Sequence, residues 1–189
     1  MIALLTTALL SLYVTAPANA AGDTAGRAHP SAVPIRAHVI RPLEVPVVRQ
    51  AREHCGQAAL AMVLRYYGAA PAALREVDAA YDPVLHGSLI TDLAGAARRA
   101  GYDAAVATLT PDELIELLHA GVPPILLYQS GAGPFTVRHF GVVTGWDAAH
   151  ASFSLLDGGA GPRVTGREDL AKRWETAGSQ ALVVRRRRP

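Results

Sequence analysis

The sequence predicts one α+β domain, with helices in its first half packed on an antiparallel sheet formed by its second half. Between residues 54 and 121 apolar side chains recur at three- and four-residue spacing, which is typical of amphipathic helices. After Pro124 this spacing gives way to short apolar runs bounded by glycine and aspartate, which is typical of strands. A run of helices followed by a run of strands favours the α+β class.

The N-terminal residues divide into two stretches that precede this domain. The first twenty residues carry no charged side chain, include an apolar stretch at 2–14 and end in Ala18-Asn19-Ala20, a signal-peptidase pattern. We therefore expect a signal peptide at 1–20 and export to the periplasm or beyond. No stable membrane span is expected after processing, because the stretch is shorter than the ~20 apolar residues that a span needs; a retained anchor is the alternative. Residues 21–43 are rich in Ala, Gly, Pro and Arg and predict a flexible arm.

Three helices are predicted in the first half, each ending at or next to a glycine. They span residues 54–67, 88–101 and 110–121. Ser88 is a favourable N-cap for the second helix. Thr110 and Glu113 form a capping box for the third.

Four strands and one short helix are predicted in the second half. The strands span residues 125–129, 139–146, 152–156 and 181–185. The helix lies near 169–177, with Trp174 on its inner face. The folded domain is therefore expected to span 44–185 and to be followed by a basic tail at 186–189.

Composition and charge exclude several classes of function. The formal net charge is +2, and the arginine run at 185–188 supplies more than this excess, so no basic face remains for nucleic acid. This run is expected to be a solvated tail; a membrane-surface or partner contact is the alternative. No Cys or His pair has the spacing of metal ligands, and the glycine-rich loops lack the residues of a phosphate cradle. Neither a metal nor another cofactor is expected.

Cys55 is the only cysteine, so the chain cannot form an internal disulfide. In an exported protein a free thiol is either buried and inert or used in chemistry. Cys55 opens the helix predicted at 54–67, where unpaired N–H groups and the helix dipole favour the thiolate. This position makes Cys55 a candidate nucleophile; a core residue on the apolar stripe is the alternative.

A nucleophilic thiol needs a base beside it, and the chain has seven histidines. His139 differs from the others because it begins the most apolar predicted strand, where a polar ring needs a partner. Asp157 ends the next strand, and the predicted hairpin brings the two within reach of a His to Asp hydrogen bond. Such a bond would fix the tautomer of the ring. The alternatives are a histidine bonded to a backbone carbonyl and an aspartate that serves only its Asp-Gly-Gly turn.

Gln50 precedes Cys55 by five residues and offers a side-chain N–H near the same helix start. An attacked carbonyl becomes an oxyanion that needs hydrogen-bond donors. Gln50 is therefore the candidate donor.

Residues 50–68, with Gln50, then Cys55-Gly56, then an Ala- and Leu-rich helix ending in Tyr67-Gly68, resemble the catalytic helix of the double-glycine leader peptidases. These are papain-like cysteine peptidases of bacteriocin export. The family also has a His-Phe or His-Tyr that opens a valine-rich strand and an Asp after the next strand. His139-Phe140 and Leu155-Leu156-Asp157 match this order and spacing.

The resemblance covers about residues 45–185 and implies a papain-like fold with four site residues. Cys55 would be the nucleophile, His139 the general base and Asp157 the orienting acid. Gln50 and the backbone N–H of Cys55 would form the oxyanion hole. The activity implied is thiol-dependent hydrolysis of a peptide bond through an acyl-enzyme, with a peptide or protein as substrate.

The chain departs from the family in two ways. His54 stands before the cysteine, where the family usually has an acidic or amide residue, and it could perturb the thiolate or the cleft. Leader peptidases are usually fused to a membrane transporter, whereas this chain is expected to be free-standing, so leader removal is not implied. Two alternatives remain: an amidase or acyl transferase with the same triad, and a catalytically silent peptide-binding module.

Overall fold

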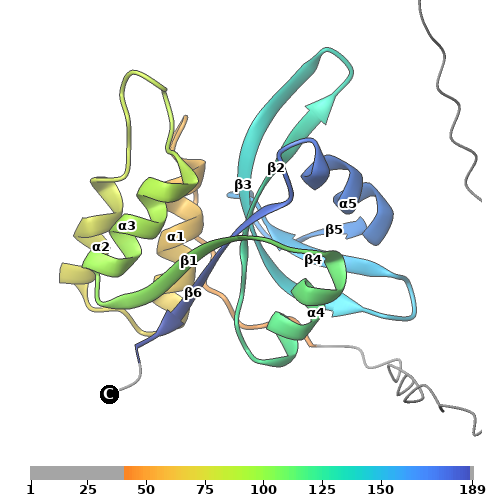
Figure 1. The fold of residues 1–189 in the computed structure, drawn as a ribbon, viewed down its shortest axis with the longest axis horizontal. Coiled ribbons are helices and arrows are strands. Elements are labelled where there is room, and N and C mark those ends of the chain that lie inside the picture. The colour runs from red at the N-terminus through yellow and green to blue at the C-terminus, as the bar shows by residue number, and fades with distance from the viewer. Residues whose placement is uncertain (1–40, 188–189) are drawn as a thin grey trace, which may run out of the picture. The chain divides into compact units, whose positions relative to one another are not determined.

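The computed structural model describes residues 41–187, which form five helices and one six-stranded sheet (Figure 1). The predicted signal peptide and nearly all of the predicted arm lie outside the described residues. The elements in chain order are α1 (Cys55–Tyr66), α2 (Pro71–Asp78), α3 (Ile90–Arg99), β1 (Tyr102–Thr108), α4 (Pro111–His119), β2 (Ile125–Ala132), β3 (Phe135–Asp147), β4 (Ser152–Leu156), β5 (Arg163–Gly166), α5 (Arg167–Glu175) and β6 (Gln180–Arg186). The predicted α+β class is confirmed.

The strands pair antiparallel in the order β1-β6-β2-β3-β4-β5. The central strands β2, β3 and β6 are apolar on both faces, because neighbouring residues such as Ile125 and Leu126 belong to different core clusters. Both faces therefore need a cover. Helices α1, α2 and α3 pack on one face, whereas α4 and α5 pack on the other (Figure 1).

The predicted helix starts were right at α1 and α4 and wrong at α3. The capping box of Thr110 and Glu113 is present at α4. Leu89, not Ser88, is the N-cap of α3. The hydroxyl of Ser88 instead accepts a hydrogen bond of 2.9 Å from the buried Gln57 side chain of α1, so it joins the two helices.

Two other boundaries differ from the prediction. Strand β3 begins at Phe135, so His139 lies inside the strand rather than at its start, because β2 and β3 continue as a two-stranded hairpin beyond the core. The run at 185–188 is not wholly a solvated tail. Arg186 ends β6 and donates a hydrogen bond of 2.7 Å to the carbonyl of Tyr67, and Arg187 contacts Asp103.

None of the helices in residues 41–187 is both long and apolar enough to cross a bilayer.

Candidate active site

A cleft of about 660 Å³ lies between the N-terminal end of α1, the segment 85–91 and strands β2 and β3. Gln50, Cys55 and His139 all line this cleft, although His139 is far from the other two in the sequence. The fourth predicted residue, Asp157, follows β4 and contacts His139. The structure thus brings the four predicted residues together.

Cys55 is the first residue of α1 and is partly buried. The next residue, Gly56, packs closely and so fixes the position of Cys55. A Cβ on Gly56 would lie 3.0 Å from Leu93 of α3 and 3.2 Å from Phe140 of β3. Burial raises the pKa of the Cys55 thiol, but hydrogen bonds from His139 and from the backbone N–H groups of Phe140 and Gly56, with the charge of His139, outweigh it. The pKa of Cys55 is therefore lowered, as a nucleophilic thiolate requires.

His139 is held by a hydrogen bond of 2.9 Å between its Nε2 and the backbone carbonyl of Asp157. A carbonyl only accepts, so Nε2 carries the hydrogen and Nδ1 is left to face the thiol. Burial lowers the pKa of His139, but the contact with Cys55 and the carbonyl and charge of Asp157 outweigh it, so this pKa is raised. The two opposite shifts favour a thiolate beside an imidazolium.

The Asp157 carboxylate lies elsewhere than the sequence predicted. Its Oδ2 is 3.4 Å from Nε of Arg163, and the backbone oxygen of Asp157, not its carboxylate, accepts the hydrogen bond from His139. The predicted partner of His139, Asp157, is thus correct, but the bonded atom is a backbone carbonyl, as the alternative for His139 proposed. Strand β5, which supplies Arg163, was not predicted because Arg163-Val-Thr-Gly166 has only one apolar residue.

Gln50 is exposed and lies against the turn that follows Asp157. A Cβ on Gly158 would stand 2.5–2.7 Å from Oε1, Cδ and Cγ of Gln50. The backbone of Gly158 has φ +84°, which glycine adopts freely and alanine does not. Gly158 therefore leaves room for the candidate oxyanion donor, a role that the Asp-Gly-Gly signal alone did not reveal.

The segment before Cys55 is tied to the loop between α2 and α3. Oε2 of Glu53, whose φ is +67°, lies 3.2 Å from both the Tyr81 hydroxyl and Nδ1 of His86. His54 stacks on Tyr81 with ring centroids 4.4 Å apart, and its Nδ1 lies 2.6 Å from the carbonyl of Arg52. The described contacts of His54 thus fix this loop, a role that sequence reasoning missed.

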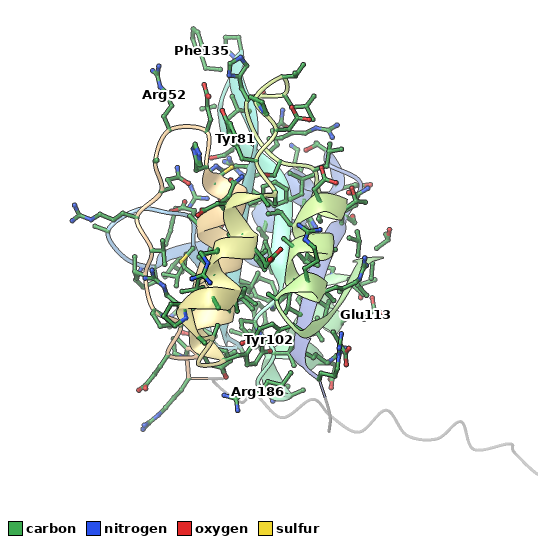
Figure 2. The ribbon with its side chains drawn as sticks, turned by 90° about the vertical axis from the view of Figure 1, so that its left-hand side faces the viewer. Arg52, Tyr81, Tyr102, Glu113, Phe135 and Arg186 are labelled. Atoms are coloured by element: carbon green, nitrogen blue, oxygen red, sulfur yellow. The ribbon has the colours of Figure 1, made fainter. Side chains whose placement is uncertain are left out.

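Exposed apolar side chains stand on both rims of the cleft. Val84 is 85 % exposed in the loop between α2 and α3, and Phe135 is 85 % exposed near the tip of the β2–β3 hairpin. Leu85, Leu89 and Val137 are also exposed and line the cleft itself. The loop and the hairpin rise at the same end of the domain (Figure 1), where Figure 2 also shows Phe135 and Tyr81. This arrangement leaves the cleft flanked by unpaired apolar surface.

Residues 41–187 contain no group of three or more His, Cys, Asp or Glu side chains that could hold a metal ion.

Three crystal structures share this fold. A double glycine motif protease from an AMS/PCAT transporter, in complex with the leader peptide, is 24% identical over 77% of this chain and 94% of its own, with TM-score 0.60. The peptidase domain of Streptococcus ComA, a bifunctional ABC transporter of a quorum-sensing pathway, is 21% identical over 76% and 99%, with TM-score 0.58. A C39-like peptidase from Bacillus anthracis is 18% identical over 80% and 100%, with TM-score 0.65.

No protein with a curated description matches the chain in sequence. The sequence profile of the peptidase C39 family, however, matches residues 44–187, which is most of the chain and nearly all of its described part. This match and the papain-like fold agree with the thiol and imidazole that share the cleft. The chain belongs to the peptidase C39 family and is a cysteine peptidase.

Proposed function

We propose that Cys55, His139 and Asp157 hydrolyse a peptide bond through an acyl-enzyme. The Cys55 thiolate attacks the carbonyl carbon, and the imidazolium of His139 gives its proton to the leaving amine. A water molecule then attacks the thioester, with His139 taking its proton, and the acid product leaves. The observation that carries this proposal is that Cys55 and His139 line one cleft, with His139 held by the backbone carbonyl of Asp157. The lowered pKa of Cys55 and the raised pKa of His139 agree with it.

Gln50 and the backbone N–H of Cys55 are the proposed oxyanion donors. The N–H of Cys55 is one of the unpaired donors at the start of α1, and Gln50 lines the same cleft. Asp157 orients His139, with its backbone carbonyl as the atom in contact.

The substrate is proposed to be an extended peptide that carries apolar side chains. The exposed rim residues Val84, Leu85 and Val137 would be covered by such a peptide, so burying them would favour its binding.

Export to the periplasm or the outside of the cell is part of the proposal, supported by the A-x-A pattern that ends at Ala20. Fractionation of cells with an antibody to the chain tests the location; a full-length protein confined to the cytoplasm contradicts it.

The test compares the purified protein with its Cys55→Ala variant on a library of peptides, with products identified by mass spectrometry. We expect cleavage by the parent and none by the variant, while both bind the same peptides. Undiminished cleavage by the variant would refute the role of Cys55.

Two further measurements separate the alternatives. Added amine acceptors that enter the product in place of water would identify an acyl transferase. A Cys55 thiol that iodoacetamide does not alkylate at neutral pH would identify a silent binding module.

A further inference from the structure

Arg163 of β5 is a charged side chain to which the proposed mechanism gives no role. It does not line the cleft, and its guanidinium lies beside the side chains of Asp157 and Tyr128, two residues that both contact His139. We infer that Arg163 is a positioning residue for the reaction, which holds the Asp157 carboxylate and Tyr128 so that the Asp157 carbonyl orients His139. This inference rests on the proposed role of His139.

Arg163 makes three contacts with these groups. Its Nε lies 3.4 Å from Oδ2 of Asp157, its Nη2 donates a hydrogen bond of 3.0 Å to the Tyr128 hydroxyl, and its Cζ stands 6.0 Å from the centre of the Tyr128 ring. The planar guanidinium can serve a carboxylate and a hydroxyl at once, whereas an ammonium acts as a point charge. Arg163 therefore fixes the side chain of Asp157 while the backbone of Asp157 holds the imidazole.

Tyr128 carries the second half of this arrangement. It is fully buried and meets His139 edge-on, with ring centroids 5.8 Å apart and planes at 88°. Gly141 makes room for it, because a Cβ there would come within 3.1 Å of Tyr128 Cε1. Burial raises the pKa of Tyr128 to about 12, so its hydroxyl stays neutral. Because Arg163 binds its hydroxyl, the Tyr128 ring stays in place and limits how far the His139 ring can tilt.

The contact with Arg163 also has an electrostatic consequence. The charge of Asp157 contributes to the raised pKa of His139, and a paired guanidinium offsets part of that charge. The titratable groups that contact His139 are Cys55 from α1, Tyr128 from β2 and Asp157 after β4. Arg138, Glu53 and His86 also line the cleft. Removing Arg163 would leave the Asp157 carboxylate unneutralised and free to move towards the imidazole.

The test measures the rate of Cys55 alkylation by iodoacetamide as a function of pH. The profile has two steps, one where the thiolate–imidazolium pair forms and one where His139 loses its proton. In Arg163→Met we expect the upper step to move up by about 0.5 pH unit, because the imidazolium gains a stronger counter-charge. In Arg163→Lys the upper step stays near its parental position, because the charge is kept.

Two controls make the test specific. Arg167→Met removes a nearby arginine that pairs with Asp112 instead and should leave both steps unchanged. In an Asp157→Asn background, Arg163→Met should move the upper step less than it does with Asp157 present, because no carboxylate is left to move towards the imidazole and only the direct repulsion between guanidinium and imidazolium is lost. A step that moves as far in this background as with Asp157 present, or one that stays fixed in a folded Arg163→Met, overturns the inference.

The outcomes also separate this inference from the proposed function. If peptide cleavage does not depend on Cys55, the proposed function fails. If cleavage depends on Cys55 but the alkylation steps ignore Arg163, only the inference fails. If Arg163→Met does not fold, Arg163→Lys still tests the inference. The pKa of His139 in this variant is then measured by an NMR titration of its ring. An increase of that pKa as large as the one expected for Arg163→Met contradicts the electrostatic argument.

Discussion

Replacing Gly158 by alanine should disable the proposed oxyanion hole without touching the thiol. The new Cβ would lie 2.5–2.7 Å from three atoms of Gln50, including Cγ, so the whole side chain must leave its place. Loss of one oxyanion donor costs roughly 10²–10³ in kcat. Alanine at φ +84° also costs about 1–2 kcal/mol of folding free energy. We expect kcat for peptide cleavage to fall by about 10², and the free energy of unfolding to fall by about the strain.

Alkylation by iodoacetamide distinguishes this effect from general damage to the site. Displacement of iodide forms no oxyanion, so Gly158→Ala should alkylate at the parental rate. Gly161→Ala is the matched control, because a Cβ on Gly161 of the same loop meets no atom within 4 Å. If Gln50→Ala loses activity while Gly158→Ala keeps it, or if the two losses simply add in the double variant, the reasoning is wrong.

Three further predictions concern the pH profile and the packing of the domain. The pH–rate profile of peptide cleavage should be bell-shaped. Its acid limb should lie below the usual pKa range of a thiol, because the pKa of Cys55 is lowered. Its alkaline limb should lie above the usual pKa range of an imidazole, because the pKa of His139 is raised. Gly56→Ala should lower the free energy of unfolding, measured by chemical denaturation, by about 1–3 kcal/mol, because α1 must shift away from α3 and β3. The same shift should slow Cys55 alkylation. Gly95→Ala, inside α3, is the control and should leave the free energy of unfolding unchanged or raise it. Thr110→Ala should cost about 1 kcal/mol through loss of the α4 cap and leave Cys55 alkylation unchanged, and slower alkylation would contradict a purely local role.

The features that the sequence predicted well depend on local signals. The helix that starts at Cys55 and the cap at Thr110 follow from apolar spacing and from hydrogen bonds within one turn. The same holds for the hairpin that brings His139 and Asp157 together, since only a four-residue turn at 148–151 separates its strands. The catalytic roles of His139 and Asp157 stay predictions, but the contact between these two residues could be predicted from the hairpin alone.

The features that were missed depend on residues far apart in the sequence. Helix α2, which opens at Pro71, was not predicted, because Val77 is its one buried residue and lies in the core that α1 and α3 share. Strand β1 has an alanine-rich sequence with weak alternation, and it pairs with β6, some eighty residues later. The carboxylate of Asp157 pairs with Arg163, whose strand has little apolar signal, so the contact of His139 with the backbone oxygen of Asp157 was not predicted.

The strand order bears on how β1 is held to the rest of the domain. Strand β1 joins the sheet only through β6, which also pairs with β2, whereas α1 packs directly on β3. Arg186 at the end of β6 bonds the carbonyl of Tyr67 just after α1. Loss of β6 would therefore detach β1 from the sheet and remove the tie from Arg186 to the end of α1. The direct contact between α1 and β3, which brings Cys55 and His139 to one cleft, does not involve β6.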